Sequence, residues 1–423
     1  MSPGVFTIEQ DSLVAHEEVS PADQWRALAT LATTMVLSMT TWLSASAVLP
    51  QLTARYGVSD TQGSFLTIVV QFGFIVGATA SALLMLPDKF DATTICGVGA
   101  GGAAVANLFL LLPIGFGGAV VFRFMTGLAL ALVYPPGVKA MATWFQKGRG
   151  LALGFMVGAL TLGSASPHFV RALAGSRGVD WRVVIACTSG LSMVGACIFK
   201  FVAKCGPFKP PPRVFTMRQL PLLLRNKALV AVTCAYLGHN WELYALWTWI
   251  SAFTQSRLVA QGWDVDATEH YAAFAAFSVV GIGTVGCVVG GVLADRYGRT
   301  LVMIVSLVLS SICSVIIGPI SEVSLPAFAV VALLWGFIAI MDSAQYSCAV
   351  TELCDPQLLG TAVTFQLAFG YILTVPTMYI VPYLSNYTPL HWTWAFSCLT
   401  PGTLLGIVAT LYLRTLPESS KLQ

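Results

Sequence analysis

Long apolar stretches without a single charge alternate with short polar connections along most of the chain. Each stretch is close to or longer than the roughly 18 to 20 residues with which a helix crosses a bilayer, and the longest must cross more than once. Because the bilayer core offers backbone amides no water, these crossings should be helical. The stretches without Asp, Glu, Lys or Arg are 27–54, 61–87, 92–122, 183–199, 272–294 and 356–413.

Turn residues divide these stretches into twelve predicted helices. An even number of crossings puts both ends of the chain on the same side of the membrane, with short tails at 1–25 and 415–423. No cleavable signal peptide precedes the first helix, so that helix itself should start insertion. The predicted helices are 26–50, 61–86, 92–113, 116–143, 149–173, 181–203, 227–256, 270–294, 299–319, 324–348, 357–383 and 390–414.

The composition agrees with a protein whose main solvent is lipid. Hydrophobic residues make up 56% of the chain and charged residues only 10%, whereas a soluble domain carries about 25% charged residues. The net charge of +3 is too small to indicate a nucleic-acid partner. Most of the ten cysteines lie singly in apolar runs without CxxC spacing, so we expect no metal site, no disulfide framework and no cofactor.

Basic residues predict the orientation, because cytoplasmic connections are rich in Lys and Arg. Most of them fall in connections that share one face, which places both termini in the cytoplasm. Three arginines on the opposite face, Arg171, Arg177 and Arg182, are exceptions to this rule. We therefore expect an integral multi-pass protein of the bacterial inner (cell) membrane. The basic residues on the cytoplasmic face are Lys147, Arg149, Lys200, Lys204, Lys209, Arg213, Arg218, Arg225, Lys227, Arg296 and Arg299.

The chain carries a charged octapeptide twice. LADRYGRT at 293–300 is partly repeated by LPDKFDAT at 86–93. A proline-rich connection at 204–226 separates the two copies. Consecutive prolines cannot continue a helix, so this connection should be an extended cytoplasmic linker. The repeat predicts a duplicated six-helix unit, with bundles at 26–203 and 227–414. Gly150 with Gly360, and Trp42 with Trp241, recur at a similar separation.

The second copy has the residues of a conformational switch. Asp295 can lie against the positive end of a neighbouring helix or pair with an arginine, Gly291 permits close helix approach, and Gly298 permits a tight turn. Such a contact would hold the two halves together in one conformation and release them in another. Alternatively, Arg296 and Arg299 only fix the orientation of the chain in the membrane.

GGVLADRYGRTLV, Gly290 to Val302, resembles the signature loop of the major facilitator superfamily. The resemblance implies an all-α membrane protein of twelve transmembrane helices in two pseudo-symmetric six-helix bundles. It also implies alternating access to a solute site near the bilayer midplane. In the first copy Asp88 holds the aspartate position, but Asp91 and Ala92 replace the expected Gly and Arg, so that contact should be weaker.

Arg123 is the one basic residue of the predicted fourth helix outside its ends. It lies about two turns from the external end, and RFMTG with Gly127 resembles a helix-four motif of the superfamily. An arginine at this place can bind a carboxylate through two parallel hydrogen bonds. Alternatively, its side chain reaches the outer interface.

Two ionisable residues lie one turn apart in the seventh helix. His239 and Glu242 share a face of the helix. A charge inside a membrane is costly unless it is paired or in contact with water, so these residues are candidates for a functional role. Burial favours the neutral form of a carboxylic acid and histidine titrates near neutral pH, so the pair is a candidate proton carrier. Alternatively, the two side chains only hydrogen-bond each other.

Asp342 lies in the tenth helix with Gln345 and Tyr346 close by. The repeat aligns it with Tyr134, Pro135 and Pro136 of the fourth helix, where we expect a kink. An acid beside broken backbone predicts a gate or a coupling-ion site. Alternatively, Asp342 pairs with Lys139 or Arg123 as a structural ion pair.

Aromatic residues crowd the seventh helix. Trp and Tyr near a helix end usually mark the membrane interface, so only Trp241 and Tyr244, with Trp42 of the first helix as symmetric partner, are predicted to line a pocket. The full aromatic set of this helix is Tyr236, Trp241, Tyr244, Trp247 and Trp249.

Together these residues predict a monomeric secondary transporter, not an enzyme, that moves a small organic anion with protons. The segment Trp144 to Pro167 resembles branches that carry monocarboxylates and other small anions. The alternatives are metabolite or drug efflux by proton antiport, and a membrane sensor without transport. Substrate contacts are predicted at Arg123, Trp42, Trp241, Tyr244, Gln345 and Tyr346, and proton coupling at His239, Glu242 and Asp342.

Overall fold

The computed structural model describes residues 20–145, 149–173, 180–208, 220–355 and 358–422, and all regular elements in them are helical. The first half contains α1 (Pro21–Met39), α2 (Ser44–Ala47), α3 (Leu49–Tyr56), α4 (Asp60–Gly63), α5 (Phe65–Leu83), α6 (Leu86–Lys89), α7 (Ala92–Leu108), η1 (Phe109–Leu111), α8 (Phe116–Leu130), α9 (Tyr134–Ala142), α10 (Arg149–Leu173) and α11 (Trp181–Phe201). The second half contains α12 (Leu220–Arg225), α13 (Lys227–Ala260), α14 (Val265–Tyr297), α15 (Arg299–Val323), α16 (Leu325–Ile338), α17 (Ser343–Leu353), α18 (Leu359–Tyr387), α19 (His391–Ala395), η4 (Phe396–Leu399), α20 (Thr400–Thr415) and η5 (Pro417–Leu422).

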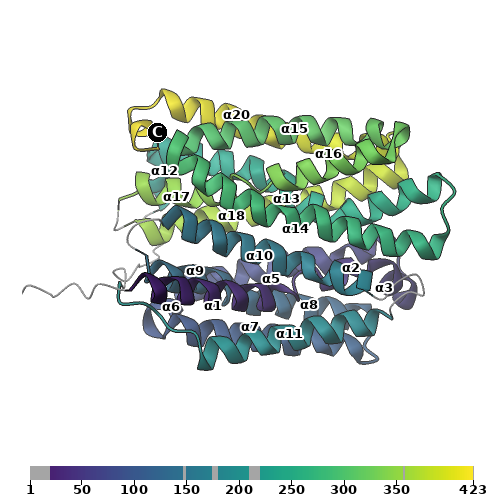
Figure 1. The fold of residues 1–423 in the computed structure, drawn as a ribbon, viewed down its shortest axis with the longest axis horizontal. Helices are drawn as coiled ribbons and strands as arrows, with labels where there is room; N and C mark the ends of the chain where they lie inside the picture. Colours follow the sequence, from purple (N-terminus) through teal and green to yellow (C-terminus); the bar gives the residue numbers. More distant parts are fainter. Residues whose placement is uncertain (1–19, 146–148, 174–179, 209–219, 356–357, 423) are drawn as a thin grey trace, which may run out of the picture.

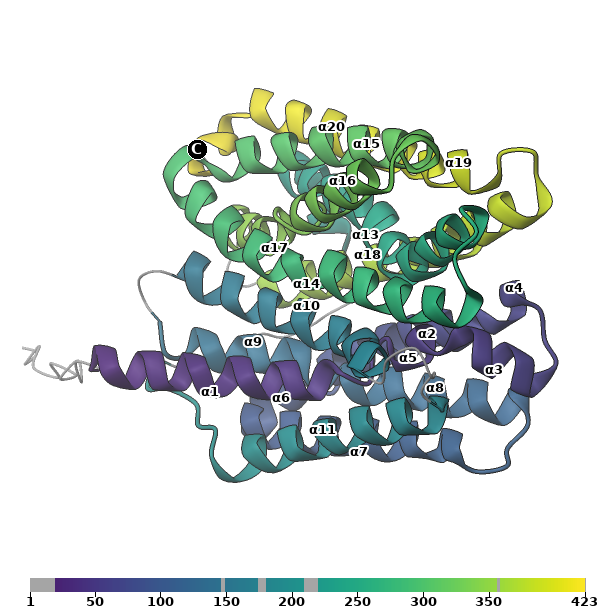
Figure 2. The same ribbon diagram turned by 45° about the vertical axis from the view of Figure 1, so that its right-hand side comes forward.

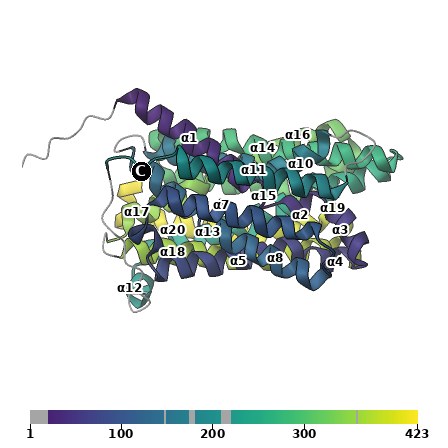
Figure 3. The same cartoon turned by 90° about the horizontal axis from the view of Figure 1, so that it is seen from below.

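The long helices run roughly side by side along the longest axis of the molecule (Figure 1). Helices of the first half gather in the lower part and those of the second half in the upper part, which Figure 2 shows again after rotation. The two halves meet most closely where α10 packs along α14, and again where α5 packs on α18. We call the left end in Figure 1 the linker end, since α11 ends and α13 begins there; α12 stands apart at that end in Figure 3.

Ten helical segments of the described residues are long and apolar enough to cross a membrane. They correspond to ten of the twelve predicted crossings, and α10 has the predicted bounds 149–173. The two others fall on α1 to α3 and on α13. The 34-residue helix α13 is long enough to cross, but His239, Asn240 and Glu242 lower its apolar character.

Several predicted helices are interrupted, among them 390–414, which divides into α19, η4 and α20. The predicted helix 116–143 divides into α8 and α9 just before Pro135 and Pro136, which can start a helix but not continue one. The predicted helix 324–348 divides into α16 and α17 at the corresponding place, although no proline stands there. The predicted helix 26–50 ends at Met39 and resumes as short turns. Asp342 therefore lies in a helix break, as the repeat predicts for its counterpart.

Glycines repeat in the two halves at a spacing that the sequence analysis missed. A Cβ added at Gly73 would lie 2.0 Å from the Phe124 carbonyl oxygen, and one at Gly286 would lie 2.1 Å from that of Phe337. In this way α5 approaches α8 closely, and α14 approaches α16 in the same manner. Lipid leaves no hydrophobic effect to drive membrane helices together, so they associate in part through van der Waals contacts where small residues let the backbones approach closely.

Candidate functional site

The second octapeptide joins the two halves at the linker end. Gly298 has φ +88°, which a side chain rarely adopts, and this lets α14 turn directly into α15. Gly291 and Asp295, one turn apart on α14, both face Gly150 near the start of α10. A Cβ added at Gly150 would lie 2.7 Å from both carboxylate oxygens of Asp295, and one added at Gly291 would lie 3.3 Å from the Gly150 carbonyl oxygen.

Arg299 links the same loop to the helix break of the second half. Its guanidinium group donates two-pronged hydrogen bonds to Glu352 on α17 at 2.6 to 3.0 Å, and it lies 3.8 Å from Asp295. It also donates to Oε1 of Gln345 at 2.9 Å. The Arg296 guanidinium lies over the Tyr297 ring at 5.3 Å. Their role as a switch stays a prediction.

The first octapeptide is built differently. Met85 takes a left-handed φ of +51°, and Asp91 caps α7 by accepting hydrogen bonds from the Thr93 and Thr94 backbone amides at 3.2 Å. Burial raises the pKa of this carboxyl, but hydrogen bonds from Thr93, Cys205 and Thr94 outweigh burial, and the pKa lies below the ordinary 3.8. The predicted contact of Asp88 lies outside the described side chains.

An ion pair joins the two halves at the opposite end. Arg171 on α10 donates to Glu269 on α14 at 2.6 Å and to the Ala47 carbonyl oxygen at 2.5 Å. Close by in the chain, Ser46 donates to the Thr248 carbonyl oxygen at 3.2 Å. Arg171 is thus a contact between the two halves.

The two other exceptional arginines differ from Arg171. Arg182 pairs with Asp180 at 2.8 Å on the surface, where both side chains are about half exposed. Arg177 lies outside the described residues. Arg171 and Arg182 therefore each have an acidic partner in the structure.

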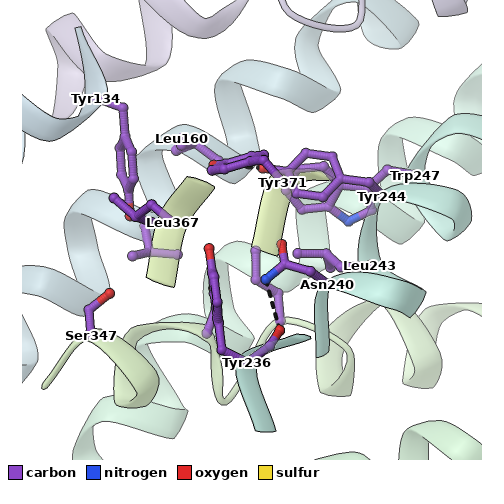
Figure 4. Close-up of a pocket in the computed structure, with 13 residues that line it drawn as sticks. Tyr134, Leu160, Tyr236, Asn240, Leu243, Tyr244, Trp247, Ser347, Leu367 and Tyr371 are labelled. Carbon is purple, nitrogen blue, oxygen red and sulfur yellow. Dashed lines mark hydrogen bonds between the residues drawn. The ribbon is translucent and has the colours of Figure 1, made fainter. Parts of the chain in front are cut away.

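A cavity lies between these two ends and is drawn in Figure 4. Both halves contribute to it: α9 and α10 from the first, and α13, α17 and α18 from the second. Its lining residues are Tyr134, Val157, Leu160, Tyr236, Asn240, Leu243, Tyr244, Trp247, Ile340, Ser343, Ser347, Leu367 and Tyr371.

Aromatic rings form much of the cavity wall. The Tyr244 ring lies 5.4 Å from Trp247 and 5.5 Å from Tyr371, and its hydroxyl donates to the Tyr371 hydroxyl at 3.1 Å. Trp42 stacks on Tyr244 at 6.1 Å from outside the lining. Trp247 is buried in this wall. The prediction that it marks the membrane interface is therefore wrong. Trp241 instead donates to the Cys398 carbonyl oxygen at 3.0 Å.

A buried polar network adjoins the cavity at the break between α16 and α17. Nδ1 of His239 lies 3.0 Å from Oδ1 of Asp342, and these side chains are 2% and 1% exposed. Tyr346 donates to Oδ2 of Asp342 at 2.5 Å. The partners of Asp342 in the structure are thus His239 and Tyr346. The alternative pairing with Lys139 or Arg123 is wrong.

Glu242 belongs to a separate network. It accepts hydrogen bonds from the Ser310 hydroxyl at 2.7 Å and from the Trp335 indole at 2.6 Å, which tie α13 to α15 and α16. His239 and Glu242 share a helix but contact different partners, so the alternative in which they hydrogen-bond each other is wrong. Glu242 and Asp342, two buried acids of the second half, are therefore held by two distinct sets of donors.

Arg123 is fully buried within the first half and does not line the cavity. Its guanidinium donates to five protein oxygens, which belong to the Leu66, Thr41 and Trp42 carbonyls and to the side chains of Ser44 and Asn107. The side chain therefore does not extend to the outer interface, which was the alternative to binding a carboxylate.

Of the six predicted substrate contacts, Tyr244 alone lines this cavity. Gln345 faces Arg299, and Tyr346 faces Asp342. The helical periodicity of α13 could have predicted more of the cavity wall from the sequence, because the lining residues of this helix recur every three or four positions. These residues are Tyr236, Asn240, Leu243, Tyr244 and Trp247.

A sequence profile of the Major Facilitator Superfamily matches residues 30–372 and again 244–423. The chain belongs to this superfamily. With its ten apolar helices of membrane-spanning length among the described residues, it is an integral multi-pass membrane protein. Within the same residues no three His, Cys, Asp or Glu side chains gather as metal ligands.

Similar proteins are known in fungi and bacteria. The MFS-type transporter opdF of Penicillium oxalicum is 26% identical over 191 residues, which cover 44% of this chain and 42% of the relative. The probable sulfoacetate transporter SauU of Cupriavidus necator is 26% identical over 210 residues, which cover 44% of this chain and 46% of the relative. These matches span less than half the length of each relative.

Solved structures agree with the fold over nearly the whole chain. The proton:xylose symporter XylE bound to 6-bromo-6-deoxy-D-glucose superposes with a TM-score of 0.70 at 13% identity, covering 94% of this chain and 96% of that chain. A bacterial homologue of the human lysosomal transporter Spinster, inward-facing and unoccupied, gives a TM-score of 0.64 at 13% identity, covering 96% and 98%. At such identities the likeness establishes the fold alone.

Proposed function

We propose that this protein is a secondary active transporter that carries a small solute by alternating access, driven by proton symport. The observation that carries the proposal is a cavity between the two halves, with contacts between the halves toward both ends and a buried network of His239, Asp342 and Tyr346 beside it. Two halves that close over a central site and separate at either end in turn would move a solute across the membrane.

The proposed membrane arrangement has twelve crossings. In it, α1 to α3 and α13 join the ten apolar segments, 26–203 and 227–414 form two six-helix bundles, and 204–226 is a cytoplasmic linker. The tails 1–25 and 415–423 are then cytoplasmic, and the linker end of the molecule faces the cytoplasm. We propose a monomer in a bacterial inner membrane as its working form.

His239, Asp342 and Tyr346 are the proposed proton carriers. Asp342 lies between the lining residues Ile340 and Ser343, so a proton on its carboxyl group changes the charge beside the solute. Taking up that proton would weaken the hydrogen bond from Tyr346 and the pairing with His239, which hold α17 against α13. Proton binding and helix movement would thereby be coupled.

Glu242 is the second proposed proton site. Its carboxylate joins three helices through Ser310 and Trp335, and protonation would weaken both hydrogen bonds at once. The two networks together could respond to protons at different steps of the cycle.

The solute class expected from the sequence is a small organic anion, with Arg123 as its charge partner. Similarity to a probable sulfoacetate transporter favours this class. It requires Arg123 to leave the five oxygens to which it donates, since in this conformation it lies outside the cavity lining. Export by proton antiport would use the same cavity in the opposite direction.

Proteoliposomes loaded with a pH-sensitive dye test the coupling. Sulfoacetate and D-xylose are added in turn, and we expect at least one to bring protons into vesicles that hold the wild-type protein. Asp342→Asn should abolish proton entry while solute counterflow continues, because the amide cannot exchange the proton. Asp180→Asn, at an exposed surface position, is the control. Solute uptake that ignores pH in the wild type would refute symport.

A further inference from the structure

We propose that the cavity takes an uncharged ring compound that carries a carbonyl or hydroxyl group, rather than a carboxylate. The inference rests on the proposed function only in treating this cavity as the solute site. It names the chemical class of that solute from the groups that would surround it (Figure 4).

The cavity wall carries no formal charge. Among the described residues that line it there is no Lys, Arg, His, Asp or Glu. Arg123, in the core of the first half, already donates to five protein oxygens. Asp342, beside the wall, would repel an anion unless it is protonated. A desolvated carboxylate in such a site would lack a partner, which is costly.

Flat rings dominate the surface that a solute would touch. The rings come from Tyr134 on α9 in the first half, and from Tyr236, Tyr244 and Trp247 on α13 and Tyr371 on α18 in the second half. Figure 4 shows these rings around one space, with Tyr371, Tyr244 and Trp247 grouped along one side. Aromatic pairs gain from offset or edge-to-face contact, so a ring-containing solute would bind between them.

Two polar groups of the wall are available to a neutral solute. The indole Nε1 of Trp247 is buried, with the residue 1% exposed, and has no hydrogen-bond partner. Asn240 donates to the Tyr236 carbonyl oxygen at 2.9 Å, which fixes its amide and leaves Oδ1 as an acceptor. Buried polar groups are almost always paired, so the Trp247 N–H calls for a ligand with an acceptor, to which Asn240 Oδ1 offers a second contact.

The cavity is narrow in this conformation and leaves room for about one water molecule, so a ring would enter as the two halves separate. An amide or phenol on a single ring would place its polar group between Trp247 and Asn240 and its ring among the tyrosines. The wall thus distinguishes solutes by charge and by shape.

Three probes of equal shape and different charge test the inference. Benzamide is neutral, benzoate is an anion and benzamidinium is a cation at pH 7. Binding of each to the purified full chain in detergent is followed by saturation-transfer NMR and by the shift in Tm, because a ligand that binds the native form stabilises it. We expect benzamide to bind at least about tenfold more tightly than either charged probe, as an unpaired buried charge costs over 1.4 kcal/mol.

A tryptophan pair on α13 supplies the matched variants. Trp247→Phe removes the unpartnered N–H and should weaken benzamide binding about three- to tenfold, the worth of one hydrogen bond. Trp249→Phe is the control, because its indole is equally buried but donates to the Met378 carbonyl oxygen at 2.8 Å outside the cavity lining. An equal loss in both variants would overturn the assignment to this cavity.

Each other outcome also decides the question. Tighter binding of benzoate, weakened by Arg123→Lys, would restore the anion class, and tighter binding of benzamidinium would indicate a cation carrier. Failure of all three probes to bind at millimolar concentration would refute recognition of a ring. Benzamide binding in a protein that shows no proton-coupled uptake would refute the proposed coupling and leave the solute class standing.

Discussion

Asp91 occupies the position in the first loop that Gly298 holds in the second. Gly298 permits a turn with positive φ, whereas Asp91 keeps an extended backbone and uses its carboxylate to cap α7. A capping aspartate satisfies amides that a helix leaves unpaired and also suits the positive end of the helix dipole. The two corresponding loops therefore lead into the next helix differently, one through a glycine turn and the other through a capping side chain.

Removing this cap should lower stability in a pH-dependent way. Asp91→Ala should cost about 0.5 to 2 kcal/mol at pH 7, seen as a lower Tm of the detergent-purified protein. Because the folded-state pKa of Asp91 is lowered, its contribution is present above the ordinary 3.8 and lost as the pH falls through the folded value. The difference in Tm between wild type and variant should therefore shrink below about pH 4.

Asp91→Asn is the matched control for that measurement. Asparagine caps helices about as well as aspartate but does not titrate, so this variant should keep most of the stability at neutral pH. A Tm deficit of Asp91→Ala that stays constant down to pH 3 would contradict the role given to the carboxylate.

At the scale of helices, the seam between α10 and α14 depends on a row of glycines one turn apart. A Cβ added at Gly154 would lie 3.1 Å from the Cys287 carbonyl oxygen, and one at Gly158 would lie 3.1 Å from that of Thr284. The row continues to Gly150, which contacts Asp295. Small residues of the first half thus determine how closely the second half can approach it at the linker end.

A larger side chain in this row should open the seam. Gly154→Leu should destabilise this closely packed conformation by about 1 to 3 kcal/mol, which lowers its population by roughly 5- to 150-fold. The buried native thiol of Cys287 reports the change, since its labelling by N-ethylmaleimide, read by peptide mass spectrometry, should rise correspondingly.

Gly190→Leu is the control for the glycine row. Gly190 lies in α11 with nothing within 4 Å of an added Cβ, so the larger side chain should leave Cys287 unreactive. Equal labelling of Cys287 in the wild type and Gly154→Leu would show that the seam is not held by this close approach.

The sequence predicted the helices far better than the partners of its polar residues. Hydrophobic length and turn residues are local signals, so α10, α11 and the turn at Gly298 were predicted closely. The partners of His239 and Glu242 come from α15, α16 and the α16–α17 break, far along the chain. Helical periodicity places these two residues on one face but cannot say which distant helix meets each of them.

The cavity was harder still to predict. Trp247 was assigned to the interface because Trp near a helix end usually lies there, but α13 extends to Ala260 and Trp247 falls in its interior. Tyr371 and Tyr134 carry no local signal that distinguishes them from lipid-facing tyrosines. Their place in the wall follows from how the two halves meet, which no single stretch of sequence encodes.

At the scale of the whole molecule, the Arg171–Glu269 pair should contribute to holding the halves together opposite the linker end. The side chains are 6% and 27% exposed and 2.6 Å apart. A double-mutant cycle of Arg171→Ala and Glu269→Ala, with stability read as Tm, should give a coupling of at least about 1 kcal/mol, because removing one partner leaves a poorly solvated charge.

The surface pair Arg182–Asp180 provides the comparison. Its atoms are 2.8 Å apart, but both side chains are about half exposed, so the same cycle should give about 0 to 1 kcal/mol. A coupling for Arg171–Glu269 no larger than this would mean that the halves are not joined by charge at that end.

The polar interior of α13 has a consequence for how the chain enters the membrane. His239, Asn240 and Glu242 lie in mid-helix and are buried only because other helices surround them. Taken alone, such a segment would partition poorly from the translocon into lipid. Nascent α13 should therefore wait at the insertion machinery until α14 to α16 emerge, so assembly of the second half would be a collective event rather than a helix-by-helix one.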